Sequence, residues 1–152
     1  MVKSIMDTQN NSNVEEIYSL QKNRRMKFPI FVAKIHAGFP SPADDFVDKK
    51  LDLNDYLISH PISTFFVRVK GDSMINAGIF SGDILIVDKA IDLQNNKIVI
   101  AFVNNEFTVK RYCKIKNKTF LMAENPEFKP IEIREGMEFQ VWGVVTTVIH
   151  QV

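Results

Sequence analysis

The pattern of apolar and polar positions changes twice along the chain, near Phe28 and near Thr64. Residues 1–27 are polar, whereas the chain after Thr64 consists of short runs rich in Val, Ile, Phe and Thr, separated by turn residues. Strands about 8–12 residues apart, with no helical pattern between them, predict a mainly β domain built as an antiparallel sheet assembly. The runs that we expect to form strands are TFFVRVK, DILIVDK, KIVIAFV, EFTVKRYCKIK, KTFLMAEN and FQVWGVVTTVIHQV.

One weak helix is predicted in the polar N-terminal arm, within the segment NNSNVEEIYSLQKNRR at residues 10–25. Ser12 and Glu15 have the spacing of a capping box. A stripe on one helical face goes with them, formed by Val14, Ile17, Tyr18 and Gln21. This stripe is too thin to stabilise an isolated helix in water. We therefore expect an arm that is flexible or that packs on the surface of a partner.

The body of the chain has one good helix candidate, the segment LDLNDYLIS at residues 51–59. Asp52 or Asn54 can cap its first turn. Pro61 disfavours helical backbone at His60, so we expect the helix to end before it. The sequence thus predicts one short helix in an otherwise β-rich domain.

The segment FPIFVAKIHAGFPSPADDFVDKK, residues 28–50, begins as a β-like apolar run and then becomes irregular. The small residues Ala37 and Gly38 precede Pro40 and Pro42, which force an extended backbone that lacks ladder hydrogen bonds. An extended stretch with small residues is how a protease substrate presents itself. The same features also suit a plain linker between the arm and the body, and the segment taken alone favours the linker.

The composition of the chain argues against several classes of protein, including non-specific DNA-binding, disulfide-linked and membrane-spanning proteins. The 152 residues carry a formal net charge of +1, with 45% hydrophobic and 24% charged residues, as in ordinary globular proteins. The charge is +3 over residues 1–37 and −2 over the rest, which is too little for the basic field of non-specific DNA binding. Cys113 is the only cysteine, so an internal disulfide is excluded. No apolar run matches a membrane span and the first residues do not resemble a signal peptide, so we expect a soluble, cytoplasmic protein.

The motifs of several large enzyme classes are missing. His36, His60 and His150 are not spaced as metal ligands, and a single cysteine rules out a multi-cysteine metal site. Glycine-rich phosphate loops and the G-x-S-x-G nucleophile elbow are also absent. We therefore expect neither a metal nor a cofactor, and we exclude nucleotide-dependent enzymes and α/β-hydrolases.

Ser73, in the tetrapeptide GDSM at residues 71–74, is a candidate nucleophile. Gly71 permits an unusual backbone angle after a strand, where a serine can sit on a rigid support beside backbone N–H groups. Lys110 is the candidate base, because burial within the strand FTVKRYC can lower the pKa of its amine. Alternation places Thr108 and Tyr112 on the same face of that strand. Taken alone, each residue favours a structural role, Ser73 in an ordinary turn and Lys110 on a solvated face.

Several landmarks occur together in one order, namely AGFPSPA at residues 37–43, GDSM at 71–74, GIFSGD at 78–83 and EFTVK at 106–110. This order closely resembles the LexA/UmuD-type family of self-cleaving Ser–Lys peptidases, and in particular its SOS mutagenesis branch. The resemblance covers about residues 28–150, which is nearly all of the predicted folded part. Its motifs are specific because each has a place in one mechanism, as cleavage site, nucleophile turn or base strand.

The resemblance implies that Ser73 is the nucleophile, Lys110 its general base and Ala37–Gly38 the scissile bond. It also implies that backbone N–H groups near Asp72 and Ser73 stabilise the oxyanion. The chain would then have an arm, residues 1–37, that self-cleavage removes, and a Ser–Lys peptidase-like domain, residues 38–152. These boundaries and roles come from the family and not from composition or spacing.

The same resemblance implies the partners. Contact with a RecA–single-stranded DNA filament would assist the cleavage. The shortened protein, as a homodimer, would then act as an accessory subunit of an error-prone, UmuC-type Y-family DNA polymerase in translesion synthesis. Neither direct sequence-specific DNA binding nor membrane attachment is expected.

Alternative functions stay open on the sequence. One is a non-catalytic dimeric polymerase accessory module with a vestigial site, and the joint presence of Ser73, Lys110 and Ala37–Gly38 argues against it. A LexA-like repressor is disfavoured, because the 36 residues before Ala37 carry one weak helix and are too few for a helix-turn-helix domain. Bacterial signal peptidases share Ser–Lys chemistry but need a membrane anchor that we do not find.

Overall fold

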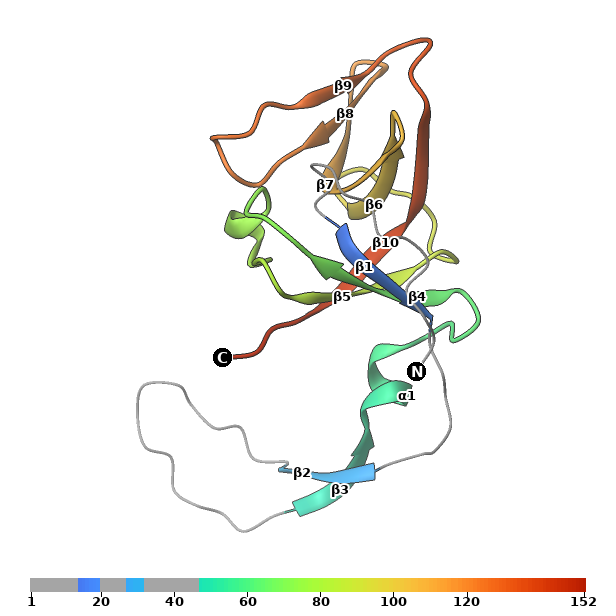
Figure 1. Ribbon diagram of the computed structural model, residues 1–152. Coiled ribbons are helices and arrows are strands. Elements are labelled where there is room, and N and C mark those ends of the chain that lie inside the picture. The colour runs from blue at the N-terminus through green and yellow to red at the C-terminus, as the bar shows by residue number, and fades with distance from the viewer. Residues whose placement is uncertain (1–13, 20–26, 32–46) are drawn as a thin grey trace. The chain divides into compact units, whose positions relative to one another are not determined.

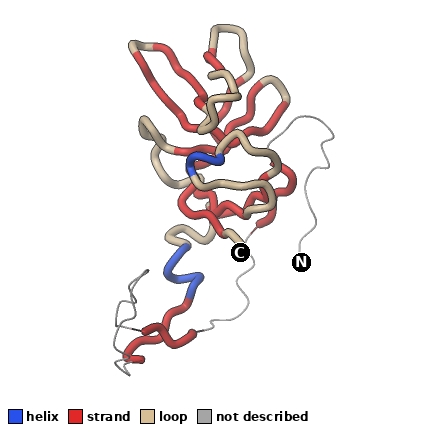
Figure 2. The backbone as a smooth tube through the Cα atoms, turned by 90° about the vertical axis from the view of Figure 1, so that its left-hand side faces the viewer, coloured by secondary structure: helices blue, strands red, loops and turns tan. Residues whose placement is uncertain are grey.

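The computed structural model describes residues 14–19, 27–31 and 47–152. The chain divides into two compact units, one made of residues 1–21 and 60–152 and the other of residues 22–59. The larger unit is built from strands and loops (Figure 1, Figure 2). Within its described residues the one helical element is a short 3-10 turn, η1 (Ile75–Ala77). The predicted domain boundary at Ala37–Gly38 lies outside the described residues and stays a prediction.

An antiparallel sheet of eight described strands forms the larger unit (Figure 1). Each strand is hydrogen-bonded to the next in the order β1 (Val14–Ser19), β4 (Thr64–Val69), β5 (Ile84–Asp88), β10 (Phe139–Ile149), β6 (Ile98–Val103), β7 (Glu106–Ile115), β8 (Lys118–Met122) and β9 (Ile131–Ile133). All of these neighbours run antiparallel. The mainly β, antiparallel class predicted from the sequence is therefore confirmed.

Strand β10 joins the two halves of this sheet. Its first part pairs with β6 and its last part pairs with β5. The register shifts between Val141 and Gly143 and again between Val145 and Thr147, and such irregularities bend a strand. A Cβ atom on Gly143 would lie only 2.8 Å from Cγ1 of Val87, so glycine is needed where β10 crosses close to β5.

All six runs predicted as strands form strands, namely β4, β5, β6, β7, β8 and β10. Two strands of the described body were missed, β9 and, in the smaller unit, β3 (Val47–Asp52). The sequence of β9 is only IEI, which is too short to show a period. The sequence of β3, VDKKLD, has two apolar residues among four charged ones and therefore carries no strand-like composition.

The prediction of a helix in the N-terminal arm is wrong for residues 14–19, which form β1. This strand pairs with β4, with Ile17 opposite Val67 and Ser19 opposite Phe65. The β-branched and aromatic side chains in VEEIYS suit a strand as well as a helix. Pairing with β4 supplies backbone hydrogen bonds and buries Val14 to 6% exposure, and these tertiary gains override the local capping-box pattern.

The smaller unit contains β2 (Lys27–Phe31), β3 and the helix α1 (Leu53–Leu57). Strands β2 and β3 form an antiparallel pair of their own. The predicted helix is confirmed, although it is shorter than the segment 51–59. Asp52 caps it as predicted, because its Oδ1 accepts a hydrogen bond of 2.9 Å from the backbone N–H of Asn54.

The main hydrophobic core of the larger unit holds the loop after β4 in place. Alternate residues of β4, β5 and β7 form most of this core, among them Val67, Leu85 and Val109, each with no exposed surface. Met74 and Ile79, which come from that loop, are 1% exposed and belong to the same cluster. The loop that carries Ser73 is thus fixed by two buried apolar side chains that follow Ser73 in the sequence, Met74 and Ile79.

Candidate active site

Ser73 lies in a tight turn between β4 and η1. Gly71 has a φ of +87°, a left-handed conformation that favours glycine, and this lets the chain turn away from β4. The backbone carbonyl of Met74 then accepts hydrogen bonds from the N–H groups of Ala77, at 3.0 Å, and Ile79, at 3.3 Å. Ser73 is 1% exposed, so its hydroxyl is held inside the protein and not on an open surface.

The segment that follows β8 clamps this turn from a second direction. The carbonyl of Ser73 accepts a 2.8 Å hydrogen bond from the N–H of Glu124, and the carbonyl of Glu124 accepts one of 2.9 Å from the N–H of Asn76. The side-chain amide of Asn125 donates a 3.0 Å hydrogen bond to the carbonyl of Asp72. Residues 72–76 are therefore tied to residues 124–125, which lie about 50 positions later in the sequence.

Glu124 and Asn125 are themselves held in position. The carboxylate of Glu124 pairs with the guanidinium of Arg111 on β7. Asn125 is 7% exposed, and its Oδ1 accepts a 3.1 Å hydrogen bond from the N–H of Glu127. A buried polar side chain with partners on both ends of its amide adds rigidity to the turns that it joins. Neither residue was predicted from the sequence as part of the site, and the only signal is a polar pair at the end of the run KTFLMAEN.

Lys110 reaches Ser73 from the middle of β7. Its Nζ donates hydrogen bonds to Oγ of Ser73 at 2.9 Å, to Oγ1 of Thr108 at 3.0 Å and to the carbonyl of Val109 at 3.0 Å. Lys110 is 5% exposed. The strand alternation that places Thr108 beside Lys110 was predicted from the sequence. Three oxygen atoms therefore fix the amine against the serine hydroxyl.

Burial changes the acid–base behaviour of this amine. Removing a charged amine from water disfavours its protonated form, and this lowers the pKa of Lys110 from its ordinary value of 10.5 to about 8. At pH 7 roughly one-tenth of such amines are neutral, whereas an ordinary lysine is neutral in fewer than about one in a thousand. A neutral amine can accept a proton from the hydroxyl to which it is hydrogen-bonded. The arrangement can therefore generate a serine nucleophile without a histidine.

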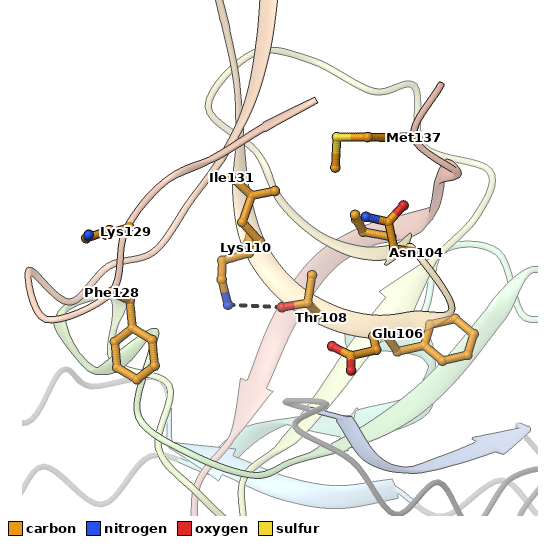
Figure 3. A pocket seen from close by; sticks show the side chains of 10 residues that line it. Asn104, Glu106, Thr108, Lys110, Phe128, Lys129, Ile131 and Met137 are labelled. Atoms are coloured by element: carbon orange, nitrogen blue, oxygen red, sulfur yellow. Dashed lines mark hydrogen bonds between the residues drawn. The ribbon is translucent and has the colours of Figure 1, made fainter. Parts of the chain in front are cut away.

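An open cavity of about 640 Å³ lies beside the amine. The cavity is lined by Glu106, Thr108 and Lys110 of β7 and by Phe128 and Met137 from the loops on either side of β9. Figure 3 shows the Lys110 side chain directed toward Thr108 within this cavity, with Phe128 on one side and Met137 on the other. The mixed polar and apolar lining suits an extended peptide, whose backbone is polar and whose side chains alternate.

The structure thus brings Ser73 and Lys110 together, as the sequence predicted. The other two predicted residues, Ala37 and Gly38, lie outside the described residues. The role of the N–H groups near Asp72 and Ser73 stays a prediction. Two histidines are engaged elsewhere: Nδ1 of His60 lies 2.6 Å from Oδ2 of Asp88, and Nδ1 of His150 lies 2.6 Å from Oδ1 of Asp83.

Within residues 14–19, 27–31 and 47–152, no group of three or more His, Cys, Asp and Glu side chains is arranged to hold a metal ion. In that part of the chain no helix has the length and apolar character needed to cross a membrane.

Comparison with known proteins identifies the family. Residues 29–146, well over half of the chain, match the Peptidase S24-like family. This chain belongs to the Peptidase S24-like family. Protein SamA of Salmonella typhimurium (strain LT2) is 46% identical over 123 residues, which are 81% of this chain and 85% of SamA. Protein MucA of Escherichia coli is 39% identical over 125 residues, which are 82% of this chain and 85% of MucA.

A shorter match extends to a repressor. The LexA repressor of Hahella chejuensis is 40% identical over 102 residues, which are 67% of this chain and 50% of that repressor. The family match and these relatives confirm the resemblance to LexA/UmuD-type proteins. They support a self-cleaving serine peptidase in general terms and, through the UmuD-type relatives, a setting in SOS mutagenesis.

Proposed function

We propose that this protein is an SOS mutagenesis protein that cleaves its own Ala37–Gly38 bond with a Ser73–Lys110 dyad. The observation that carries the proposal is the 2.9 Å hydrogen bond from Nζ of Lys110 to Oγ of Ser73, between two residues that are 5% and 1% exposed. Nucleophile and base are already in contact, and burial lowers the pKa of the base toward neutral pH. The family membership supports the same chemistry.

The proposed reaction begins with neutral Lys110. Its Nζ takes the hydroxyl proton of Ser73 while Oγ attacks the carbonyl carbon of Ala37, and backbone N–H groups near Asp72 and Ser73 stabilise the oxyanion. The protonated amine of Lys110 then gives its proton to the nitrogen of Gly38, and the peptide C–N bond breaks. Water hydrolyses the resulting ester, which leaves a carboxylate on Ala37, an amine on Gly38 and a free Ser73 hydroxyl.

Thr108 and the carbonyl of Val109 have a supporting part in this scheme. They accept two of the three hydrogen bonds that Nζ of Lys110 donates, so they orient the amine toward Ser73. The cavity beside Lys110 would receive the extended segment before Gly38. The absence of a side chain on Gly38 would let the leaving group approach the crowded turn at Ser73.

The biological setting of the proposal rests on the resemblance to SOS mutagenesis proteins. A RecA–single-stranded DNA filament would promote the cleavage, and the product of residues 38–152 would form a homodimer that serves an error-prone Y-family polymerase of the UmuC type. The similarity to MucA and SamA, over more than four-fifths of this chain, supports an SOS mutagenesis context for this proposal.

Incubation of the full-length protein with an activated RecA filament tests the proposal by intact-mass analysis. We expect loss of residues 1–37 and a product of 115 residues that begins at Gly38. Gly38→Glu should block the reaction, because a charged side chain would collide with the nucleophile turn. Ser41→Glu is the matched control, which adds the same charge away from the scissile bond and should be cleaved. Absence of the 115-residue product, both with the filament and at alkaline pH, would show that the proposal is wrong.

Asn125 should affect the rate through the position of Ser73. Asn125→Asp keeps an oxygen for the N–H of Glu127 but loses the donor to the carbonyl of Asp72. We expect self-cleavage to slow about tenfold, because small displacements of a nucleophile are costly. The pH at which the rate levels off should not change, since Lys110 is untouched, and Asn95→Asp on an exposed loop should cleave at the wild-type rate. If Asn125→Asp cleaves at the wild-type rate, as measured by intact mass, Asn125 does not position Ser73.

A further inference from the structure

Strand β1 covers the outer edge of β4 in the large sheet (Figure 1). The two strands pair from Val14, opposite Val69, to Ser19, opposite Phe65. The other neighbour of β4 is β5, so within the described sheet β4 would be an edge strand without β1. An exposed strand edge is a template for another strand, and proteins usually protect it.

Side chains as well as backbone match β1 to this edge. Val14 is 6% exposed and joins the main core, and Ile17 packs against the same cluster. On the other face, Oε2 of Glu16 accepts a 3.0 Å hydrogen bond from Nε of Arg68 on β4 and another from the hydroxyl of Tyr18. The occupant of the edge is therefore defined by branched apolar residues and by a carboxylate opposite Arg68.

An apolar groove lies beside β1. It has a volume of about 460 Å³ and is lined by Ile17 of β1 together with aromatic residues of β6, β7 and β10, namely Phe102, Phe107, Phe139 and Trp142. The rings of Phe107 and Trp142 pack edge to face with centroids 4.5 Å apart. Loss of β1 would remove the Ile17 wall and join the groove to the open edge of β4.

If the chain cleaves itself as proposed above, β1 is separated from the strand with which it pairs; this step of the inference rests on the proposed function. Strand β1 lies before Ala37–Gly38, so self-cleavage would cut its covalent connection to β4. While the chain is intact, the tether gives β1 a high effective concentration at its site. After cleavage the same six-residue strand must bind as a separate peptide, and an isolated short strand binds weakly.

We propose that β1 is a detachable edge strand, and that its release opens the β4 edge and the adjoining apolar groove to an extended segment of a partner protein. The partner segment adds to the sheet as β1 does, antiparallel to β4, with branched apolar side chains over the core and a carboxylate opposite Arg68. We infer this chemistry of the partner segment from β1, which occupies the site in the intact chain. The intact chain keeps the site closed with its own arm.

A labelled peptide of residues 13–20, NVEEIYSL, is the probe for this site. We expect fluorescence anisotropy to show binding to the cleaved product and at least tenfold weaker binding to the full-length Ser73→Ala protein, in which β1 still occupies the edge. Hydrogen exchange of residues 64–69 should be faster in the product and should slow when the peptide is added. Equal peptide affinity for the product and the uncleaved protein would overturn the inference.

The contact between Glu16 and Arg68 gives a charge-swap test. Arg68→Glu should weaken peptide binding at least fivefold, and a peptide with Glu16→Arg should restore it. Arg134→Glu is the matched control, because Arg134 is also an exposed arginine paired with a glutamate, Glu132, but on β9 and the turn after it. If the swapped peptide does not restore binding, the peptide does not place residue 16 opposite residue 68, and the predicted register is wrong.

A variant separates this inference from the proposed cleavage. In a full-length chain with Ser73→Ala and Ile17→Asp, the charge placed against the hydrophobic core should release β1 although the chain is not cut. The peptide should bind this double variant and not the Ser73→Ala parent, even if the wild-type protein never cleaves itself. No binding to a folded double variant would refute the detachable strand alone. A product dimer that dissociates when the peptide is added would assign the edge to a second copy and overturn the partner assignment.

Discussion

Lys110→Ala is expected to slow self-cleavage at pH 7 by at least about a hundredfold, because it removes the proposed general base. In the wild-type protein the rate should rise with pH and level off above about 8, since only the neutral amine accepts the proton and burial lowers the pKa of Lys110 to about 8. Lys110→Arg should stay inactive across this range, because arginine remains protonated. An intact-mass time course without the RecA filament, at a series of pH values, measures all three.

Two controls belong to this experiment. Lys114→Ala removes an exposed lysine from the same strand and should leave the rate and its pH dependence unchanged. Lys110→Met keeps most of the side-chain volume without a base, so it should fold and fail to cleave. A wild-type rate for Lys110→Arg, or a wild-type rate that does not change with pH, would contradict the role assigned to Lys110.

Ser73→Ala should reduce cleavage by at least about a thousandfold at every pH, because no other group at this position can form the ester. The fold should be retained, since alanine fits the space of a serine that is 1% exposed and loses only the hydroxyl contacts. Intact mass gives the rate, and thermal unfolding checks the fold.

Ser63→Ala is the matched control for this variant. The Ser63 hydroxyl also lies in a loop beside β4 and donates a 3.0 Å hydrogen bond to Asp88, so its removal tests the general effect of losing a partly buried serine contact. This control should cleave at the wild-type rate. If Ser73→Ala yields the same 115-residue fragment as fast as the wild type, a contaminating protease makes the cut and the dyad is wrong.

The strands of the body could be predicted because their residues are buried on at least one face. Runs such as DILIVDK and KIVIAFV contribute side chains to the hydrophobic core, so they are rich in Val and Ile, and this composition indicates strands. Strand β1 has three charged or polar residues among six and β3 has four charged ones, so composition alone reveals neither strand. Their pairing depends on β4 and β2, respectively, and a pairing partner far along the chain is not visible in a local pattern.

The candidate site also contains residues that could be predicted from the sequence and one that could not. Ser73 and Lys110 could be predicted because each belongs to a motif that resembles a known family, and the alternation on β7 placed Thr108 beside the amine. Asn125 could not be predicted, because its role depends on a contact with Asp72, 53 positions earlier in the chain. No periodicity or spacing rule shows which loop will meet which turn once a sheet has curled.

The burial of Lys110 has a consequence for the stability of the whole fold. The difference between the ordinary pKa of 10.5 and about 8 means that the protonated amine costs the folded state roughly 3 kcal/mol of unfolding free energy. Below pH 8 this penalty is fully present. Between about 8 and 10.5 the unfolded chain binds a proton that the folded chain does not, so stability rises with pH. Catalytic competence and the free energy of unfolding therefore increase in the same direction across pH 8, and both changes arise from the loss of one buried charge.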